Sequence, residues 1–308
     1  MQIIIGGFGR SGTTWLSDII SKCLGGIILF EPFHPGVFTS SEEFTYSEEI
    51  DVKSIRSHLK SLYNSSPSNP WILRNHLNSP LENHSASFIR YVWSNSKVLG
   101  YKTIRGNHSI DRLSKIQESS RVVYIYRHPL AVLASINKRA RFWDEFGWQR
   151  HKELFFEKAL SGAVIRKERW TELRSLLNHL ATKNEIIVAM WAVSFAISIE
   201  KVQKIEGYFV SYESLYLNPY EEVKMLTKYL NVENASLHPS YFFTPSMTSM
   251  KTLHHLRKYE EDAEVNLNEL FWMKEFGVAE TEKLLDLCER ILQYSKSAHD
   301  LARQNNYI

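Results

Sequence analysis

The sequence predicts an α/β fold, with a central parallel sheet flanked by helices, on three observations. Short and largely apolar runs recur along the chain and are typical of buried strands. The segments between them place apolar residues at helical spacing. The chain has 308 residues, enough to bury a substantial core in one domain covering residues 1–308. The predicted strands are 2–5, 27–30, 97–101, 121–126 and 207–210.

The composition is that of an ordinary globular protein without a general preference for polyanions. Hydrophobic residues make up 44% of the chain, charged residues 23%, and the formal net charge is +3. Because this charge is small, an anionic ligand has to be attracted by local clusters of cations, and nucleic acid is not indicated as a partner. The 12 histidines show no HExxH or Cys/His spacing, so no metal site is predicted.

The first strand runs directly into a glycine-rich turn, which predicts a site for phosphate or sulfate. Glycines in this turn let successive backbone N–H groups converge on an anion. The helix predicted for residues 13–24 points the positive end of its dipole at the same place. Hydroxyl side chains and one arginine complete the site. The predicted anion ligands are Arg10, Ser11, Gly12, Thr13 and Thr14.

This P-loop-like turn departs from the nucleoside triphosphate motif GxxxxGK(S/T) at one important position. Gly7 and Gly12 have the P-loop spacing, but Thr13 stands where the motif has lysine, and the cation lies upstream at Arg10. A P-loop enzyme also needs a carboxylate after a second apolar strand to hold Mg²⁺. The best such strand, 122–126, ends in Arg-His-Pro. A kinase or NTPase that uses ATP and Mg is therefore the disfavoured alternative.

A second anion site is predicted after the strand at 121–126. Arg127 can offer a bidentate fork to a phosphate, and Pro129 suits the first turn of the helix that follows. Ser135 lies two turns into this helix. Arg139 follows Ser135 by four residues, so the two share a helix face and can reach the same anion.

The two motifs resemble those of the sulfotransferase superfamily that uses 3′-phosphoadenosine 5′-phosphosulfate (PAPS). GFGRSGTTWL at 7–16 resembles the 5′-phosphosulfate loop, in the arginine form of the carbohydrate and tyrosylprotein branches. RVVYIYRHPLAVLASI at 121–136 resembles the 3′-phosphate motif. The resemblance implies PAPS as donor, 3′-phosphoadenosine 5′-phosphate (PAP) as product and no required metal. It assigns the 3′-phosphate to Arg127, Ser135 and Arg139, and the 5′-phosphosulfate to the turn.

The strand at 27–30 delivers a carboxylate, Glu31, to the edge of the sheet where α/β folds bind ligands. The surrounding Leu-Phe-Glu-Pro resembles a segment of carbohydrate sulfotransferases whose glutamate is proposed to deprotonate the acceptor hydroxyl. Glu31 could instead cap the next turn or pair with an arginine. His34 is the rival base, because its ordinary pKa suits proton transfer near neutrality.

Three later segments supply further candidates. Lys102 follows the strand at 97–101 and resembles, by position, the lysine that stabilises the transferring sulfuryl group in the tyrosylprotein branch; a surface lysine is the alternative. Tyr212 follows the strand at 207–210 and resembles the family's tyrosine near the adenine. Residues 244–251 resemble the loop that closes over the nucleotide. The candidates in that loop are Ser246, Ser249 and Lys251.

Two long segments, 36–96 and 141–184, interrupt the predicted sheet, and we expect partly helical insertions on the acceptor side or simple decoration. The apolar run at 186–199 is too short to span a bilayer and predicts a buried core helix. Two cysteines without a CxxC pair indicate a reducing compartment. The first strand begins at Gln2 and leaves no room for a signal peptide, so we expect a cytoplasmic protein, unless an upstream stem is missing. On that expectation the four Asn-x-Ser sequons, at 64, 83, 107 and 234, are chance occurrences.

The sequence therefore predicts a sulfotransferase that moves a sulfuryl group from PAPS to an acceptor hydroxyl by in-line displacement. Glu31 is the expected base, and Arg10 and Lys102 are expected to stabilise the charge of the transferring group. The expected acceptor is a carbohydrate or glycolipid, with a lipid, a peptide or a small alcohol left open. A nucleotide-binding module that keeps the loop but lacks a working base is a further alternative.

Overall fold

The centre of the fold is a five-stranded sheet with the strand order β2-β3-β1-β4-β5, in which every neighbouring pair is parallel. The five predicted strands are confirmed, and the third extends far enough to include Lys102. Their bounds are β1 Gln2–Gly6, β2 Ile27–Phe30, β3 Val98–Thr103, β4 Ser120–Tyr126 and β5 Tyr208–Ser211. The computed structural model describes residues 2–38, 47, 50–64, 71–73, 85–138, 147–160, 167–232, 235–243 and 269–308.

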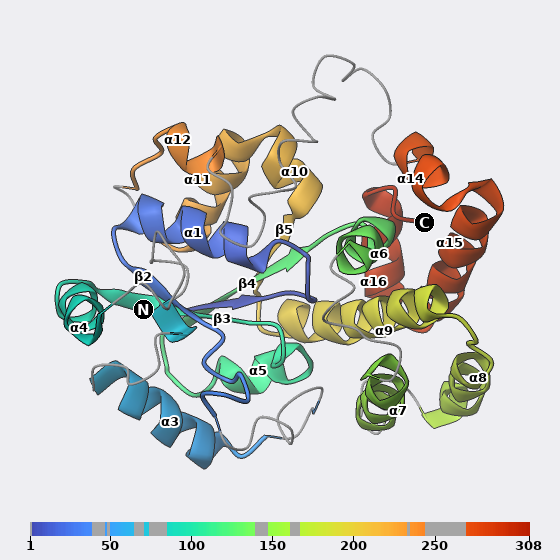
Figure 1. Cartoon of the computed structure of the whole chain (residues 1–308), viewed down its shortest axis with the longest axis horizontal. Helices are drawn as coiled ribbons and strands as arrows, with labels where there is room; N and C mark the ends of the chain where they lie inside the picture. The colour runs from blue at the N-terminus through green and yellow to red at the C-terminus, as the bar shows by residue number, and fades with distance from the viewer. Residues whose placement is uncertain are drawn as a thin grey trace.

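Helices cover both faces of the sheet, as Figure 1 shows. One face carries α1 (Thr13–Leu24), α10 (Tyr212–Leu217), α11 (Pro219–Tyr229) and α12 (Ser240–Phe243). The helices of the other face and of the C-terminal half are α3 (Val52–Asn64), α4 (Ala86–Ser94), the 3-10 helix η3 (Asn107–Ser109), α5 (Ile110–Leu113), α6 (Pro129–Asn137), α7 (Gly147–Leu160), α8 (Lys167–Asn178), α9 (Lys183–Lys204), α14 (Glu269–Phe276), α15 (Val278–Leu292) and α16 (Lys296–Gln304).

Alternation along the strands explains why their sequences are apolar throughout. Successive side chains of a strand point to opposite faces, so a strand covered on both sides needs apolar residues at every position. In β4, Tyr124 packs into the core beneath α9, whereas Val123 and Ile125 pack into the core beneath α1 and α11. This sheet is therefore a rigid base whose carboxyl ends hold the loops of interest in fixed positions.

The predicted core helix is confirmed and is longer than expected. The helix α9 has 22 residues and is buried along most of its length. It begins with a capping box, in which the Thr182 hydroxyl and the Glu185 carboxylate satisfy each other's backbone N–H groups. Among the described residues, none of the helices combines the length and the apolarity needed to cross a bilayer.

The segments expected to be insertions do carry helices. Residues 36–96 include α3 and α4, and residues 141–184 include α7 and α8. Their expected role on the acceptor side stays a prediction.

The helix α6 begins with a histidine cap that can act only when the imidazole is neutral. Nδ1 of His128 accepts a hydrogen bond from the Leu130 N–H over 3.2 Å, and His128 is buried. Burial, together with the nearby Arg127 charge, lowers the pKa of His128 from 6.5 to about 3. Below pH 6.5 the unfolded chain therefore binds a proton at His128, whereas the folded chain does not bind it until the pH falls to about 3.

We predict that His128→Asn removes this acid sensitivity, because asparagine keeps a capping acceptor and does not titrate. Above pH 6.5 the neutral cap contributes its full stability to the fold, because His128 is then unprotonated in the folded and unfolded chains alike. This contribution is lost as the pH falls from 6.5 toward about 3. The unfolding free energy of the variant should thus rise relative to that of the wild type by about 1.4 kcal/mol per pH unit, between pH 6.5 and about 3. Urea unfolding of both proteins across this range measures the difference.

The difference between the two proteins, not the wild-type curve, is the informative quantity. Burial raises the pKa of Asp18 to about 7, so Asp18 titrates in the same range with the opposite effect on stability. Both proteins share that contribution, and it cancels. A constant difference in unfolding free energy between pH 7 and about 5 would contradict the neutral-cap assignment.

Candidate active site

The glycine-rich turn between β1 and α1 is fixed by an asparagine that lies far away in the sequence. The Asn107 side chain accepts a hydrogen bond from the Gly7 N–H over 3.0 Å and donates one to the Gly7 carbonyl over 2.7 Å. A Cβ atom on Gly7 would lie 2.6 Å from the Ile125 carbonyl oxygen, so only glycine lets the turn pack against β4. Sequence reasoning treated Asn107 as a chance sequon and missed this role. Its buried amide is committed to the turn.

The structure brings the two predicted anion motifs into direct contact. Nε of Arg10 donates a hydrogen bond to the Ser135 hydroxyl over 3.0 Å. A guanidinium N–H of Arg127 donates to the Arg10 carbonyl over 3.4 Å. Arg10 has a φ of 72°, a left-handed conformation that costs energy for a residue with a Cβ and is common at functional sites. The strained turn thus positions one arginine beside the other.

Polar atoms at this junction fit an anionic group. Among the described residues, the buried hydroxyl of Ser11 and the buried Nε of Arg127 have no hydrogen-bond partner. An unsatisfied buried donor is costly, and a phosphate or sulfate oxygen would satisfy it. The first turn of α1, with buried Thr13 and Thr14, follows Gly12 without a side-chain cap, which leaves backbone N–H groups for an anion.

Tyr212 lies against the same junction. Its ring centroid is 4.1 Å from the guanidinium carbon of Arg127 and 5.2 Å from the ring centroid of Trp15. Gly12 has a φ of 95°, and a Cβ atom there would lie 2.5 Å from the Tyr212 ring. The ring therefore packs on the turn and on the second arginine at once. Its predicted contact with adenine stays a prediction.

Glu31 lies in a buried cluster with two cations at the carboxyl ends of β2 and β3. Nζ of Lys102 is 2.9 Å from one carboxylate oxygen, and the Arg105 guanidinium forms an ion pair with the other. Lys102 also lies over the Phe30 ring, 3.8 Å from its centroid. Lys102 is 2% exposed, so it is not the surface lysine of the alternative interpretation. The alternative in which Glu31 pairs with an arginine describes the geometry correctly.

The charges of this cluster set its protonation. Burial alone would raise the pKa of Glu31, but the Lys102 and Arg105 charges outweigh it and lower that pKa below its usual range. Burial lowers the pKa of Lys102, and the Glu31 carboxylate opposes that effect only in part. At neutral pH Glu31 is therefore ionised and can accept a proton, although its low pKa makes it a weak base in this state.

His34 remains close to Glu31, and its charge also lowers the pKa of that carboxyl. Its Nδ1 accepts a hydrogen bond from the Gly36 N–H over 3.1 Å, and its ring lies 4.4 Å from the Trp71 ring. Sequence reasoning missed Arg105, although this residue follows the end of β3 by two positions. The strand-end logic that singled out Glu31 and Lys102 could have found it.

The other predicted donor ligands stay predictions. They lie outside the described residues and are Arg139, Ser246, Ser249 and Lys251.

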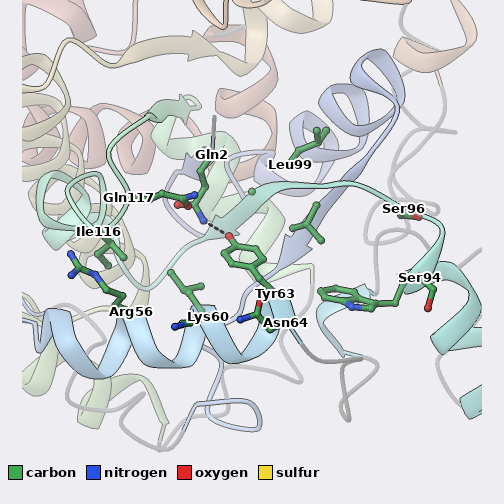
Figure 2. A pocket seen from close by; sticks show the side chains of 14 residues that line it. Gln2, Arg56, Lys60, Tyr63, Asn64, Ser94, Ser96, Leu99, Ile116 and Gln117 are labelled. Carbon is green, nitrogen blue, oxygen red and sulfur yellow. Dashed lines mark hydrogen bonds between the residues drawn. The ribbon is translucent and has the colours of Figure 1, made fainter.

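A cavity of about 690 Å³ lies at the opposite, amino-terminal edge of the sheet. Figure 2 shows α3 along one side of it and the start of β1, with Gln2, on the other. Its lining includes Gln2, Arg56, Lys60, Tyr63 and Trp93. Ligands of parallel α/β sheets bind outside the carboxyl ends of the strands, so this cavity is separate from the anion site.

Comparison with known proteins gives the chain its family. The solved structures that resemble it include the sulfotransferase domain of the curacin biosynthetic pathway, with 13% identity, coverage of 100% of this chain and 98% of that chain, and a TM-score of 0.44. The sulfotransferase domain of the Synechococcus PCC 7002 olefin synthase has 15% identity, coverage of 94% of this chain and 93% of that chain, and a TM-score of 0.40. A sulfotransferase of Mycobacterium avium has 12% identity, coverage of 96% of this chain and 76% of that chain, and a TM-score of 0.42. No curated protein matches. The family model described as "Sulfotransferase family" matches residues 2–236, well over half of the sequence. The chain therefore belongs to the sulfotransferase family.

Proposed function

We propose that the protein transfers a sulfuryl group from PAPS to an acceptor hydroxyl, and that the acceptor is a carbohydrate or glycolipid. The observation that carries the donor part is the direct contact of Arg10 with Ser135 and Arg127, which joins the two predicted anion sites. A donor with phosphate groups on both the 3′ and 5′ sides matches two adjoining anion sites. The acceptor part rests on the arginine form of the loop and on the Phe-Glu-Pro segment.

Different residues at the junction bind the two charged groups of the donor. Arg10, the Ser11 hydroxyl and the backbone N–H groups of residues 12–14 hold the 5′-phosphosulfate. The Ser11 N–H, expected among them, instead donates to the Phe8 carbonyl over 3.0 Å. Arg127 and Ser135 hold the 3′-phosphate, with Arg139 and the 244–251 loop as further ligands. Because Arg10 and the hydrogen-bond donors of the turn are held in place before the reaction, they stabilise the charge that develops on the bridging oxygen without reorganising.

The transfer itself is an in-line displacement at sulfur. A bond forms between the acceptor oxygen and sulfur while the bond from sulfur to the bridging oxygen breaks, and PAP departs with the electron pair. Glu31 takes the acceptor's proton. Lys102 neutralises the remaining sulfuryl oxygens. An ionised carboxylate has about four acceptor positions, so Glu31 can accept a hydrogen bond from a hydroxyl while it keeps its two cations. His34 is the second candidate for the base.

Calorimetry with PAP and with ATP, each with and without Mg²⁺, tests the donor. We expect PAP to bind without Mg²⁺ and ATP to bind more weakly, because Arg127 and Ser135 recognise a phosphate that ATP lacks. The substitution Arg127→Ala should weaken the binding of PAP far more than the binding of adenosine 5′-phosphate (AMP). Tight, Mg²⁺-dependent binding of ATP would favour the kinase alternative instead.

A transfer assay with labelled PAPS and a panel of saccharides, glycolipids, lipids, peptides and small alcohols tests the acceptor. We expect label on a saccharide or glycolipid. Label on another class would replace the acceptor part of the proposal and leave the donor part standing. PAP binding without transfer to any acceptor would favour the non-catalytic alternative.

A further prediction concerns the base. Glu31→Gln should lower turnover by at least about 10²-fold, because glutamine cannot take the acceptor's proton. PAP should bind at least as tightly as to the wild type, because the variant lacks the carboxylate charge that repels the donor. The change also leaves Lys102 and Arg105 without their counter-charge, which costs about 3–5 kcal/mol of stability. Unfolding must therefore be measured beside activity, at a temperature where the variant is folded.

Two variants control this experiment. Glu289→Gln removes a carboxylate that pairs with Arg303 away from the site, and activity should not change. His34→Gln should keep most of the activity. An active Glu31→Gln variant together with an inactive His34→Gln variant would move the base to His34.

A prediction about pH dependence follows from the low pKa of Glu31 in the free protein. The bound donor brings several negative charges near the carboxylate, which opposes its ionisation and raises its pKa. The acid limb of kcat, which reports the complex with both substrates, should therefore lie at higher pH than the acid limb of kcat/KM for the donor, which reports the free enzyme. Acid limbs in the opposite order would contradict this coupling.

A further inference from the structure

Tyr307 lies buried against the end of β4, although it comes from the C-terminal segment after α16. The residue is 1% exposed. Its ring packs edge-on against those of Tyr126 and His128, with centroid distances of 5.8 and 5.3 Å, and against Trp191 of α9 at 6.3 Å. Tyr126 and His128 flank Arg127 in the chain. Figure 1 shows the C-terminus close to α6, the helix that follows Arg127.

The Tyr307 hydroxyl is linked to the backbone of His128 by the Glu213 carboxylate. It donates a hydrogen bond to one oxygen of Glu213, and the other oxygen accepts the His128 N–H over 3.1 Å. The Ser211 hydroxyl also donates to Glu213, over 3.2 Å. Burial raises the pKa of Tyr307 well above its usual value, so the hydroxyl stays protonated and remains a donor.

Glu213 lies next to both members of the pair formed by Arg127 and Tyr212. It is the chain neighbour of Tyr212, whose ring lies 4.1 Å from the Arg127 guanidinium carbon. It also holds the backbone of His128, the chain neighbour of Arg127. One carboxylate therefore ties together the two chain segments that carry Arg127 and the ring on which its guanidinium lies.

We propose that Tyr307 is a positioning residue for recognition of the donor's 3′-phosphate. Its hydroxyl fixes the Glu213 carboxylate, which holds His128 and Tyr212 in place and so aims Arg127 at the 3′-phosphate. Tyr307 itself touches neither the donor nor the reacting atoms. The C-terminal segment thereby strengthens the preference for a donor with a 3′-phosphate without contacting the donor. This proposal rests on the proposed function, because it needs a donor with a 3′-phosphate.

The variant Tyr307→Phe tests the proposal, because phenylalanine keeps the packed ring and removes only the donated hydrogen bond. Calorimetry measures its affinity for PAP and for AMP, which lacks the 3′-phosphate. We expect PAP to bind about fivefold to tenfold more weakly and AMP to bind as to the wild type, since a hydrogen bond to a charged group is at stake. A role in packing or stability alone would not change the ratio of the two affinities.

A matched control comes from the same part of the chain. The hydroxyl of Tyr294 also donates to a carboxylate, that of Glu172 over 3.5 Å, but at the surface. Tyr294→Phe should leave both affinities unchanged. If Tyr307→Phe fails to fold, Glu213→Gln replaces it and should show the same selective loss. Where both fold, the double variant should lose no more than the stronger single variant, because both act through one chain of hydrogen bonds.

The outcomes separate this proposal from the proposed function. A wild-type protein that binds PAP no better than AMP would overturn both. If the wild type prefers PAP and Tyr307→Phe weakens PAP and AMP equally, or weakens neither, only the positioning role falls.

Discussion

The proposed donor site depends on the adjacency of β1 and β4 in the sheet. These strands are parallel neighbours, with Gly6 opposite Tyr124, so the segments that follow them emerge side by side. The hydrogen bond between Arg127 and Arg10 then joins residues that lie 117 positions apart in the chain. Each segment carries one of the two predicted anion sites, and the sheet register sets their separation. Neither segment could form a joint site without the strand pairing, because a loop alone has no fixed partner.

A second pairing creates the carboxylate cluster. In the register of β2 and β3, Phe30 lies opposite Lys102, and the Glu31 N–H donates to the Lys102 carbonyl over 3.1 Å. The backbone thus forces the Glu31 and Lys102 side chains together beneath Arg105. Burying such charges costs desolvation energy that their attraction barely repays, so a buried ion cluster is poor evidence for a role in stability. Its position at the carboxyl ends of the strands favours a role in the chemistry instead.

The sequence was sufficient for the features that local patterns encode. Continuous apolar runs predicted the strands correctly. The anion sites predicted from the glycine-rich turn and the Arg127 segment stay predictions, although the structure brings these two segments into contact. The bounds of β3 were wrong by two residues at its end, because Lys102 is polar yet pairs within the sheet. Asn107 and Tyr307 could not be predicted, since each acts through a partner about 100 residues away and neither stands in a distinctive motif. Such contacts are set by tertiary packing, which periodicity does not record.

The charge balance of the cluster explains how a weak base in the free protein can serve the proposed reaction. Lys102 and Arg105 share the single negative charge of Glu31, so the cluster keeps a net positive charge. Asp18 does not fully cancel it, because burial raises the pKa of Asp18 to about 7 against the pull of Lys22 and Lys102. In a buried site such an imbalance acts strongly, since little water screens it. In the proposed reaction a polyanionic donor supplies the missing negative charge, and this charge opposes the effect by which the two cations hold the pKa of Glu31 down. On this proposal, donor binding and activation of Glu31 as the base follow from one electrostatic event.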